Sequence, residues 1–338
     1  MNILAVESSC DETAVAIIRD GREVLTDCIA SQVALHREYG GVVPEIASRK
    51  HIEAIYSLAD EALEKTGLKR CDIDAVAVTY APGLIGAVLV GVNFAKAAAL
   101  TLGVPLIPVH HIRGHIAANY LAYPELKPPF LCLVVSGGHT MFVDVQDYTK
   151  MRILGTTLDD AAGECFDKVA RVLGMPYPGG AALDKAAAQG DPEKYPLPRA
   201  KSGQNPYDMS FSGLKTAALN LINRAQQMNE ALDVNSLCAS FASAVSDTLV
   251  PRLELAIKET GYTQVAIAGG VAANSRIRKD VQALTEQYGV QLFMPPLSLC
   301  GDNAAMIGAQ GYYEYLAGNV AGMDLNAYAT KSILGEKM

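Results

Sequence analysis

The stretch that decides the fold is the N-terminal run Ile3-Leu4-Ala5-Val6-Glu7-Ser8-Ser9-Cys10-Asp11-Glu12-Thr13-Ala14-Val15-Ala16-Ile17-Ile18. Residues 3–7 and 14–18 are apolar runs of strand length, and the residues between them are mostly small or polar. Asp20-Gly21 then predicts a turn, and residues 23–30 predict a third strand. The chain therefore opens as strand, hairpin turn, strand, turn, strand.

The same order recurs about one domain length later. Residues 130–135 form an apolar strand, 136–140 a small polar turn that again ends in Thr, and 141–145 a second strand. We therefore expect a duplicated α/β fold of two lobes that face each other across a cleft. The Pro-bounded segment 124–129 marks the boundary. We expect an N-terminal lobe at 1–128 and a C-terminal lobe at 129–338, whose final helix packs back across the cleft.

Composition narrows the functional class. Of the 338 residues, 50% are hydrophobic and 19% are charged, and the net charge is −8, which argues against a broad non-specific nucleic-acid binder. Seven Cys without C-x-x-C pairs are typical of reduced thiols, and the N-terminus lacks a basic leader, so we expect a cytoplasmic protein. The apolar run 75–109 is punctuated by Gly and Pro. This pattern favours a buried strand–turn–helix–strand over a membrane span.

His111 and His115 lie four residues apart at a strand-to-helix junction. On a helix this spacing puts both imidazoles on one face, where they can share a metal ion. The plain alternative is that both are ordinary polar residues at a helix start. A zinc protease would need Glu directly after the first His, and Ile112 occupies that place. From the residues alone, the third ligand stays open among Asp11, Asp167, Asp184 and Asp302.

Two Gly-Gly pairs precede helices in the second half, at 179–180 and 269–270. Backbone N–H groups at such a turn suit a phosphate, although a plain turn is an equal alternative at the first of them. The second pair follows an apolar strand at 264–268, which is an arrangement typical of nucleotide sites. Neither pair ends in Gly-Lys-Ser/Thr, so the chain is not a P-loop NTPase.

Taken together, eight motifs resemble the bacterial TsaD family, formerly called Gcp or O-sialoglycoprotein endopeptidase. They are Glu7–Thr13, Gly41–Arg49, Pro82–Gly86, His110–His115, Val135–Thr140, Ser210–Thr216, Gly269–Asn274 and Gly301–Ala304. The resemblance extends to about Gly318. Two departures are Ala81, where the family usually has Gly, and Ile112-Arg113, where it has Met or Leu followed by Glu. Neither departure touches a proposed ligand, but both could alter packing or partner contact.

The resemblance implies a two-lobed actin/sugar-kinase/Hsp70-like (ASKHA) α/β fold, each lobe with an RNase H-like sheet. It implies a metal-dependent acyltransferase that acts in tRNA processing. The threonylcarbamoyl group would move from threonylcarbamoyl-AMP to the adenosine 3′ of the anticodon, in tRNAs that read codons beginning with A. It also implies two protein partners, the TsaB paralogue and the TsaE ATPase, and no membrane association.

The resemblance further implies how the site residues divide. His111, His115 and Asp302 would hold one divalent metal, Fe(II) in preference to Zn(II). Asp11 and Glu12 are candidates for proton handling or for shaping the site. Since the amine attacks the carbamoyl carbon directly, no Cys is needed as a nucleophile. The adenylate would be bound by Val134, Val135, Ser136, Gly137, Gly138, His139, Thr140, Asp167, Gly180, Asp184 and Asn274.

Three other functions are alternatives to a tRNA transferase. A small-molecule kinase or chaperone-type ATPase shares this fold but has no use for the His pair. A metalloprotease lacks its general base, and a non-catalytic scaffold would not need intact His111, His115 and Asp302.

Overall fold

The computed structural model describes residues 1–199 and 203–334. They form two compact units, which are described separately below. Unit 1 comprises Met1–Pro128, Gln146–Met151 and Pro295–Met338, and unit 2 comprises Pro129–Val145 and Arg152–Met294. The first boundary falls at the expected linker. The expected C-terminal lobe differs in that everything from Pro295 onward groups with unit 1, as does the short segment 146–151; residues 335–338 lie outside the described part.

Unit 1 is built on a five-stranded sheet with the order β3-β2-β1-β4-β5. Its strands are β1 (Asn2–Glu7), β2 (Glu12–Arg19), β3 (Glu23–Ser31), β4 (Ala75–Ala81) and β5 (Leu106–His110). β1 runs antiparallel to β2 and parallel to β4, with Val6 opposite Val15 on one side and Val78 on the other. The carboxyl ends of β1, β4 and β5 therefore meet at one edge, where α/β folds place their chemistry.

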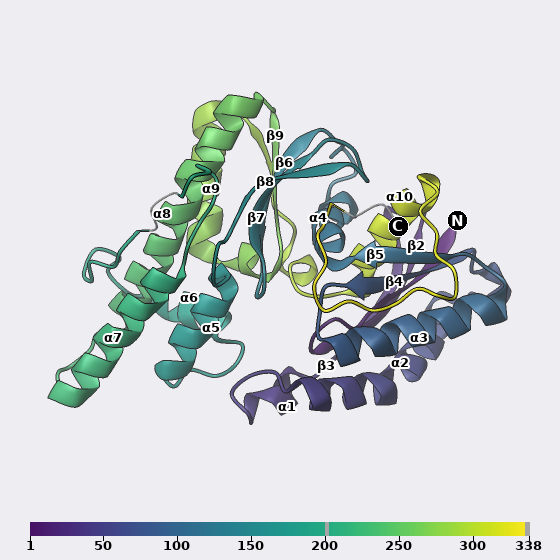
Figure 1. The fold of residues 1–338 in the computed structure, drawn as a ribbon, viewed down its shortest axis with the longest axis horizontal. Helices are drawn as coiled ribbons and strands as arrows, with labels where there is room; N and C mark the ends of the chain where they lie inside the picture. The colour runs from purple at the N-terminus through teal and green to yellow at the C-terminus, as the bar shows by residue number, and fades with distance from the viewer. Residues whose placement is uncertain (200–202, 335–338) are drawn as a thin grey trace. The chain divides into compact units, whose positions relative to one another are not determined.

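Helices cover both faces of this sheet, as Figure 1 shows. They are α1 (Val33–Arg37), α2 (Pro44–Thr66), α3 (Ile85–Leu102), α4 (His111–Ala122) and α10 (Ala304–Leu316), with short 3₁₀ turns at Arg70–Asp72 and Leu297–Leu299. α2 begins with Pro in its first turn and ends at Gly67 in the left-handed conformation, a common pair of start and stop signals. α2 and α3 lie on one face, and α4 and α10 on the other.

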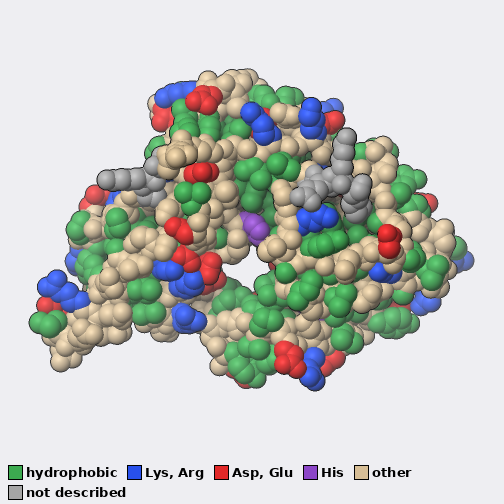
Figure 2. Space-filling model, viewed as in Figure 1, with side chains coloured by type: hydrophobic (Ala, Val, Ile, Leu, Met, Phe, Trp, Pro, Cys, Tyr) green, Lys and Arg blue, Asp and Glu red, His purple; other side chains and the backbone are tan. Residues whose placement is uncertain are grey.

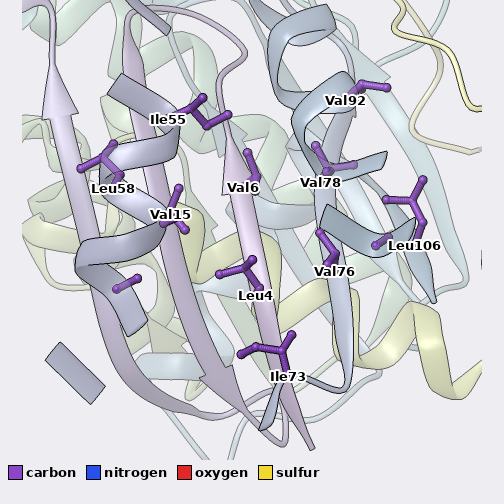
Figure 3. Packing of buried hydrophobic residues seen from close by; sticks show 14 of the residues in the cluster. Leu4, Val6, Val15, Ile55, Leu58, Ile73, Val76, Val78, Val92 and Leu106 are labelled. Atoms are coloured by element: carbon purple, nitrogen blue, oxygen red, sulfur yellow. The ribbon is translucent and has the colours of Figure 1, made fainter. Parts of the chain in front are cut away.

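The alternation of side chains along β1 explains why the strand is apolar throughout. Leu4 and Val6 pack with Val15, Ile55 and Leu58 in the cluster beneath α2 and α3 (Figure 3). Ile3 and Ala5 point to the opposite face and pack in a second cluster with residues of α4 and α10. A strand covered on both faces buries every side chain, so its sequence loses the polar alternation of an exposed strand.

The apolar run at 75–109 folds as β4, a turn, α3 and β5, as expected. Among the described residues, α3 alone is long and apolar enough to cross a membrane by length and composition. It packs against α2 and β4 inside unit 1. The core helix of a globular protein passes the same test, so this helix is weak evidence for a membrane span.

Unit 2 repeats the same sheet. Its strand order is β10-β9-β6-β7-β8. Read from the other edge, as β8-β7-β6-β9-β10, this order matches that of unit 1, with β6 in the place of β1. β6 is antiparallel to β7 and parallel to β9, which is in turn parallel to β10. The strands are β6 (Phe130–Val135), β7 (Thr140–Val145), β8 (Met151–Thr156), β9 (Gln264–Ala268) and β10 (Gln291–Phe293). The expected duplication is therefore present in topology, strand for strand.

Unit 2 also carries a set of helices, among which α8 is the longest (Figure 1). They are α5 (Ala162–Val172), α6 (Gly179–Ala187), α7 (Ser212–Met228), α8 (Val234–Thr260) and α9 (Ser275–Tyr288), with a 3₁₀ turn at Gly270–Ala273. α5 starts at Ala162, three residues after Asp159. Asp159 is used elsewhere, because its carboxylate accepts hydrogen bonds from the backbone N–H groups of Phe211 and Ser212 at the start of α7. α8 continues through Pro251.

Candidate metal and adenylate sites

The start of α4 presents two histidines on one face. His110 ends β5 and caps α4: its Nδ1 accepts the Ile112 N–H at 3.3 Å, so its Nε2–H donates to the Lys331 carbonyl at 3.0 Å. His110 is therefore directed away from the pair, as expected. The rings of His111 and His115 are 4.5 Å apart and both are buried. The four-residue spacing thus brings the imidazoles together as predicted.

Asp302, just before α10, completes a three-residue cluster. Its Oδ1 lies 3.5 Å from His111 Nε2 and 3.3 Å from His115 Nε2. Ligand atoms of these three residues all lie within 4.8 Å of one another, close enough to surround one ion. Of the four aspartates left open by the sequence, the structure brings Asp302 to the pair. Two imidazoles and one carboxylate suit Fe(II) or Zn(II) with coordination positions left open.

A buried carboxylate orients the first histidine. Glu7, at the end of β1, is fully buried, and its Oε2 lies 2.9 Å from His111 Nδ1. Thr79, in the last half of β4, donates its hydroxyl to the same Oε2 at 2.6 Å. With Nδ1–H donated to Glu7, a metal would bind at Nε2 of His111 in place of a proton, which is the usual arrangement behind a metal-bound histidine.

The two histidines have opposite electrostatic environments. Burial alone would lower the pKa of His111, but the carboxylates of Asp302 and Glu7 raise it to about 9. Burial lowers the pKa of His115, and the neighbouring His111 lowers it further. The Nδ1 of His115 is buried with no hydrogen-bond partner among the described residues. The residues present therefore fit a bound cation: three converging donors, one of them backed by a second carboxylate.

Asp11 ends the turn between β1 and β2, and Glu12 is the first residue of β2, in the same unit as the cluster. Glu12 Oε1 accepts a hydrogen bond from the Ser31 hydroxyl at 2.8 Å, while its Oε2 is buried without a partner in the described part of the chain. Burial, helped by the nearby carboxylates of Asp11 and Asp302, raises the pKa of Glu12 to about 7. A carboxyl group with this pKa is suited to proton transfer near neutral pH.

In unit 2, the turn between β6 and β7 is open and glycine-rich. Ser136 closes it, because its backbone N–H donates to the His139 carbonyl at 2.7 Å and its Oγ accepts the His139 N–H at 3.1 Å. A Cβ added to Gly137 or Gly138 would meet no atom within 4 Å. These glycines are therefore not required by packing inside the protein, which is consistent with close approach of a ligand to the backbone.

The other predicted adenylate residues fasten neighbouring turns of unit 2. Asp167 Oδ1 accepts the N–H groups of Gly179 and Gly180 at 2.8 and 3.1 Å. Asp184 accepts the Ser275 hydroxyl at 2.8 Å, and Asn274 caps α9. The Gly179-Gly180 amides, expected to be open for a phosphate, are therefore occupied by a carboxylate. Val134 and Val135 are buried in β6, where only their backbone groups can serve a ligand. The binding roles of all these residues stay predictions.

Sequence reasoning missed the residues that support the site from behind. Glu7 ends the apolar strand β1, Thr79 lies two residues before the end of the apolar strand β4, and His51 interrupts the apolar stripe of α2. The available signal was a lone polar residue at the end of a strand or within an apolar stripe, since such a residue is costly to bury without a partner. The departure Arg113 is explained locally: it forms a buried ion pair with Glu314 at 2.7 Å.

Comparison with known proteins decides the family. Residues 23–309 match the model of the TsaD family, tRNA N6-adenosine threonylcarbamoyltransferase. A protein of that name from Moorella thermoacetica is 55% identical over 96% of this chain and 95% of its own length. One from Clostridium botulinum is 49% identical over 100% of this chain and 99% of its own length. The chain belongs to the TsaD family.

Membership of the TsaD family confirms the expected function, a transferase that places threonylcarbamoyl on an adenosine of tRNA, over the kinase, protease and scaffold alternatives. Solved structures confirm the ASKHA fold at low sequence identity. A nucleotide-bound HypF has a TM-score of 0.62 at 14% identity, covering 93% of this chain and 46% of that one. Component A of (R)-2-hydroxyglutaryl-CoA dehydratase from Acidaminococcus fermentans has a TM-score of 0.54 at 17% identity, covering 93% and 97%.

Proposed function

We propose that this chain uses threonylcarbamoyl-AMP as its donor and modifies the adenosine 3′ of the anticodon in tRNAs that read codons beginning with A. In the step itself, the N6 amine of the adenosine forms a bond to the carbamoyl carbon. The bond from that carbon to the phosphate oxygen breaks, AMP leaves with the electron pair, and the amine loses one proton. The reaction balances with no covalent enzyme intermediate and no cysteine nucleophile.

Glu12 is the group that we assign to take the amine proton. Three observations support this role: its raised pKa, its buried oxygen with no hydrogen-bond partner among the described residues, and its position at the start of β2 in the unit that holds the histidine cluster. Asp11, next to it in the turn, shapes the site and keeps the pKa of Glu12 high. General-base assistance of this kind contributes about 10²- to 10⁴-fold to a rate.

His111, His115 and Asp302 would hold one divalent metal, Fe(II) in preference to Zn(II). When bound, the metal would supply Lewis-acid polarisation or orientation of the carbamoyl donor. The single observation that carries this proposal is the convergence of two histidine Nε2 atoms on one Asp302 oxygen, backed by Glu7. A kinase of the same fold needs no such cluster.

Unit 2 would bind the adenylate. The open Ser136–Thr140 turn offers backbone donors to the phosphate, and Asp167, Gly180, Asp184 and Asn274 border neighbouring turns. A cavity of about 220 Å³ supports the placement of the base, because its lining includes Ser275, the partner of Asp184, with small apolar residues, Arg276 and Lys279. This volume is below that of a typical ligand site and suits part of a nucleotide.

We further propose that the protein works in the cytoplasm with a TsaB-type paralogue and a TsaE-type ATPase. On the face drawn in Figure 2, the Lys and Arg side chains of the described residues are scattered among acidic and apolar ones, which suits a chain that does not hold tRNA alone. Apolar side chains exposed on the adjacent helices α2 and α3 suit a protein partner; they are Ile52, Tyr56, Ile85 and Leu89.

A transfer assay tests the proposal. The protein, its partner proteins, unmodified tRNA and threonylcarbamoyl-AMP are mixed. The tRNA is then digested to nucleosides, whose masses are measured by mass spectrometry. We expect threonylcarbamoyl-adenosine with the wild type, none with His111→Ala, and normal product with His110→Asn, a neighbouring variant that keeps a helix-capping oxygen. Product from His111→Ala would remove the metal role. No product from the wild type with active partners would overturn the proposed reaction.

A further inference from the structure

Three elements hold the backbone of the β1–β2 turn in place. The carbonyl of Ser9 accepts the Leu84 N–H at 2.8 Å, and the carbonyl of Asp11 accepts the Gln32 N–H at 3.0 Å. Between them, the carbonyl of Cys10 lies 2.9 Å from His51 Nε2. Three consecutive carbonyls are thus anchored, and the middle anchor alone is a side chain.

His51 reaches this turn from the apolar stripe of α2. The buried residues of that stripe recur at helical spacing, and His51 is the polar member among Ala47, Ile55, Leu58, Ala59 and Ala62. Its side chain is fully buried. Burying an imidazole costs free energy unless both ring nitrogens are hydrogen-bonded, so its presence in an apolar stripe points to a specific contact.

The two partners of His51 fix its tautomer. A carbonyl can only accept, so Nε2 carries the proton and donates it to Cys10. Nδ1 is then the acceptor, and the Thr13 hydroxyl donates to it at 2.7 Å. Burial lowers the pKa of His51, in keeping with a neutral ring. The chain Thr13 to His51 to Cys10 therefore joins the first residues of β2 to the turn and spans both sides of Asp11 and Glu12.

We propose that His51 is a positioning residue for the transfer reaction, which fixes the turn bearing Asp11 and Glu12 through its bonds to Cys10 and Thr13. The inference rests on the proposed roles of these two carboxyl groups. The hydrogen bonds of His51 in the described part of the chain go to Thr13 and Cys10. His51 therefore acts by holding two carboxyl groups whose placement matters, since a displacement of about 1 Å can cost as much as 10²-fold in rate.

A substitution at Thr13 tests the proposal while His51 stays in the apolar stripe of α2. Thr13→Val removes the hydroxyl that Nδ1 needs and keeps the shape, while Thr13→Ser keeps the hydroxyl as the matched control. With the full set of partners, we expect Thr13→Val to lower kcat about ten-fold at unchanged KM for threonylcarbamoyl-AMP. We expect its metal content to be unchanged and Thr13→Ser to behave as the wild type.

A double-mutant cycle separates positioning from a general loss of structure. In an Asp11→Asn, Glu12→Gln background the turn has no carboxylates to position, so adding Thr13→Val should lower kcat by less than two-fold. An equal ten-fold loss in both backgrounds would overturn the proposal, as would equal kcat values for the Val and Ser variants. If the wild type makes product but Asp11→Asn, Glu12→Gln is fully active, it is the proposed role of the carboxylates that fails.

Discussion

The two hairpin turns, β1–β2 in unit 1 and β6–β7 in unit 2, occupy the same place in the same sheet topology but differ in chemistry. The first is largely buried, and Asp11 and Glu12 follow a strand that ends in the buried carboxylate Glu7. The second is open and built around Gly137 and Gly138, whose Cβ positions face empty space. One scaffold thus presents carboxylates beside a histidine cluster in unit 1 and backbone amides in unit 2.

The difference teaches that a duplicated fold specialises through its turns. The strands on either side pack alike, because β1, β2, β6 and β7 are buried along nearly their whole lengths and need apolar side chains. The turn residues lie at the carboxyl end of the first strand, where α/β folds place their chemistry, and each copy carries different residues there.

The largest expected effect is loss of the metal from unit 1 alone. Asp302→Ala removes the oxygen shared by both histidines, so we expect metal content to fall from one per chain to near zero. Transfer should fall by more than the roughly 10- to 100-fold typical of residues behind a ligand. Metal analysis and the transfer assay measure this, with exposed Asp324→Asn as the control. AMP binding by unit 2 should persist; its loss would break the proposed division between the two turns.

The next effect concerns Glu12. Because its ionised form accepts the proton and its pKa is raised to about 7, the rate should increase as pH rises through about 7. Glu12→Gln should lower the rate about 100-fold and flatten this limb. Single-turnover rates measured over about three pH units around pH 7 test both the loss of rate and the loss of pH dependence. An unchanged pH profile in Glu12→Gln would mean that another group accepts the proton of the adenosine amine. Substitution of an exposed glutamate, Glu23→Gln, serves as the control.

A smaller effect on metal affinity is expected from Glu7, which orients the metal ligand His111. Glu7→Gln keeps the shape of the side chain but loses the charge that holds His111 with Nε2 free. We expect metal affinity to fall about 10- to 100-fold. Competition titration of the metal-free protein against a chelator measures it. Thr79→Val, which removes one hydrogen bond to Glu7, should have a weaker effect in the same direction. Equal affinities in the wild type and Glu7→Gln would contradict the orienting role.

The smallest effect is expected in the glycine turn of unit 2. Gly138→Ala adds a methyl group that meets no protein atom, so the melting temperature and metal content should not change. The same methyl group would obstruct a phosphate lying against the backbone, and we expect AMP to bind about ten-fold more weakly. Isothermal titration with AMP measures this. Unchanged AMP affinity would place the phosphate away from this turn.

The sequence was sufficient for whatever depends on neighbours along the chain. Apolar runs of strand length separated by polar turns predicted the hairpins of both units. The ends of α2 and α3 are local in the same sense, because each helix stops at a glycine in the left-handed conformation, Gly67 and Gly103. The four-residue spacing placed His111 and His115 on one face. Contacts distant in sequence are outside this reach: the carboxylate of Asp159, just before α5, accepts a hydrogen bond from the backbone at the start of α7.

Other features were decided only by tertiary structure. Among four candidate aspartates, Asp302 is the one brought to the histidine pair, since α10 packs on β1 and α4 rather than on the unit from which the chain has just emerged. Glu7, Thr79 and His51 acquire their roles in the same way, from contacts across the sheet. Local pattern fixes which residues share a face of one element. Which faces meet depends on burial summed over the whole unit, and no single stretch of sequence contains that sum.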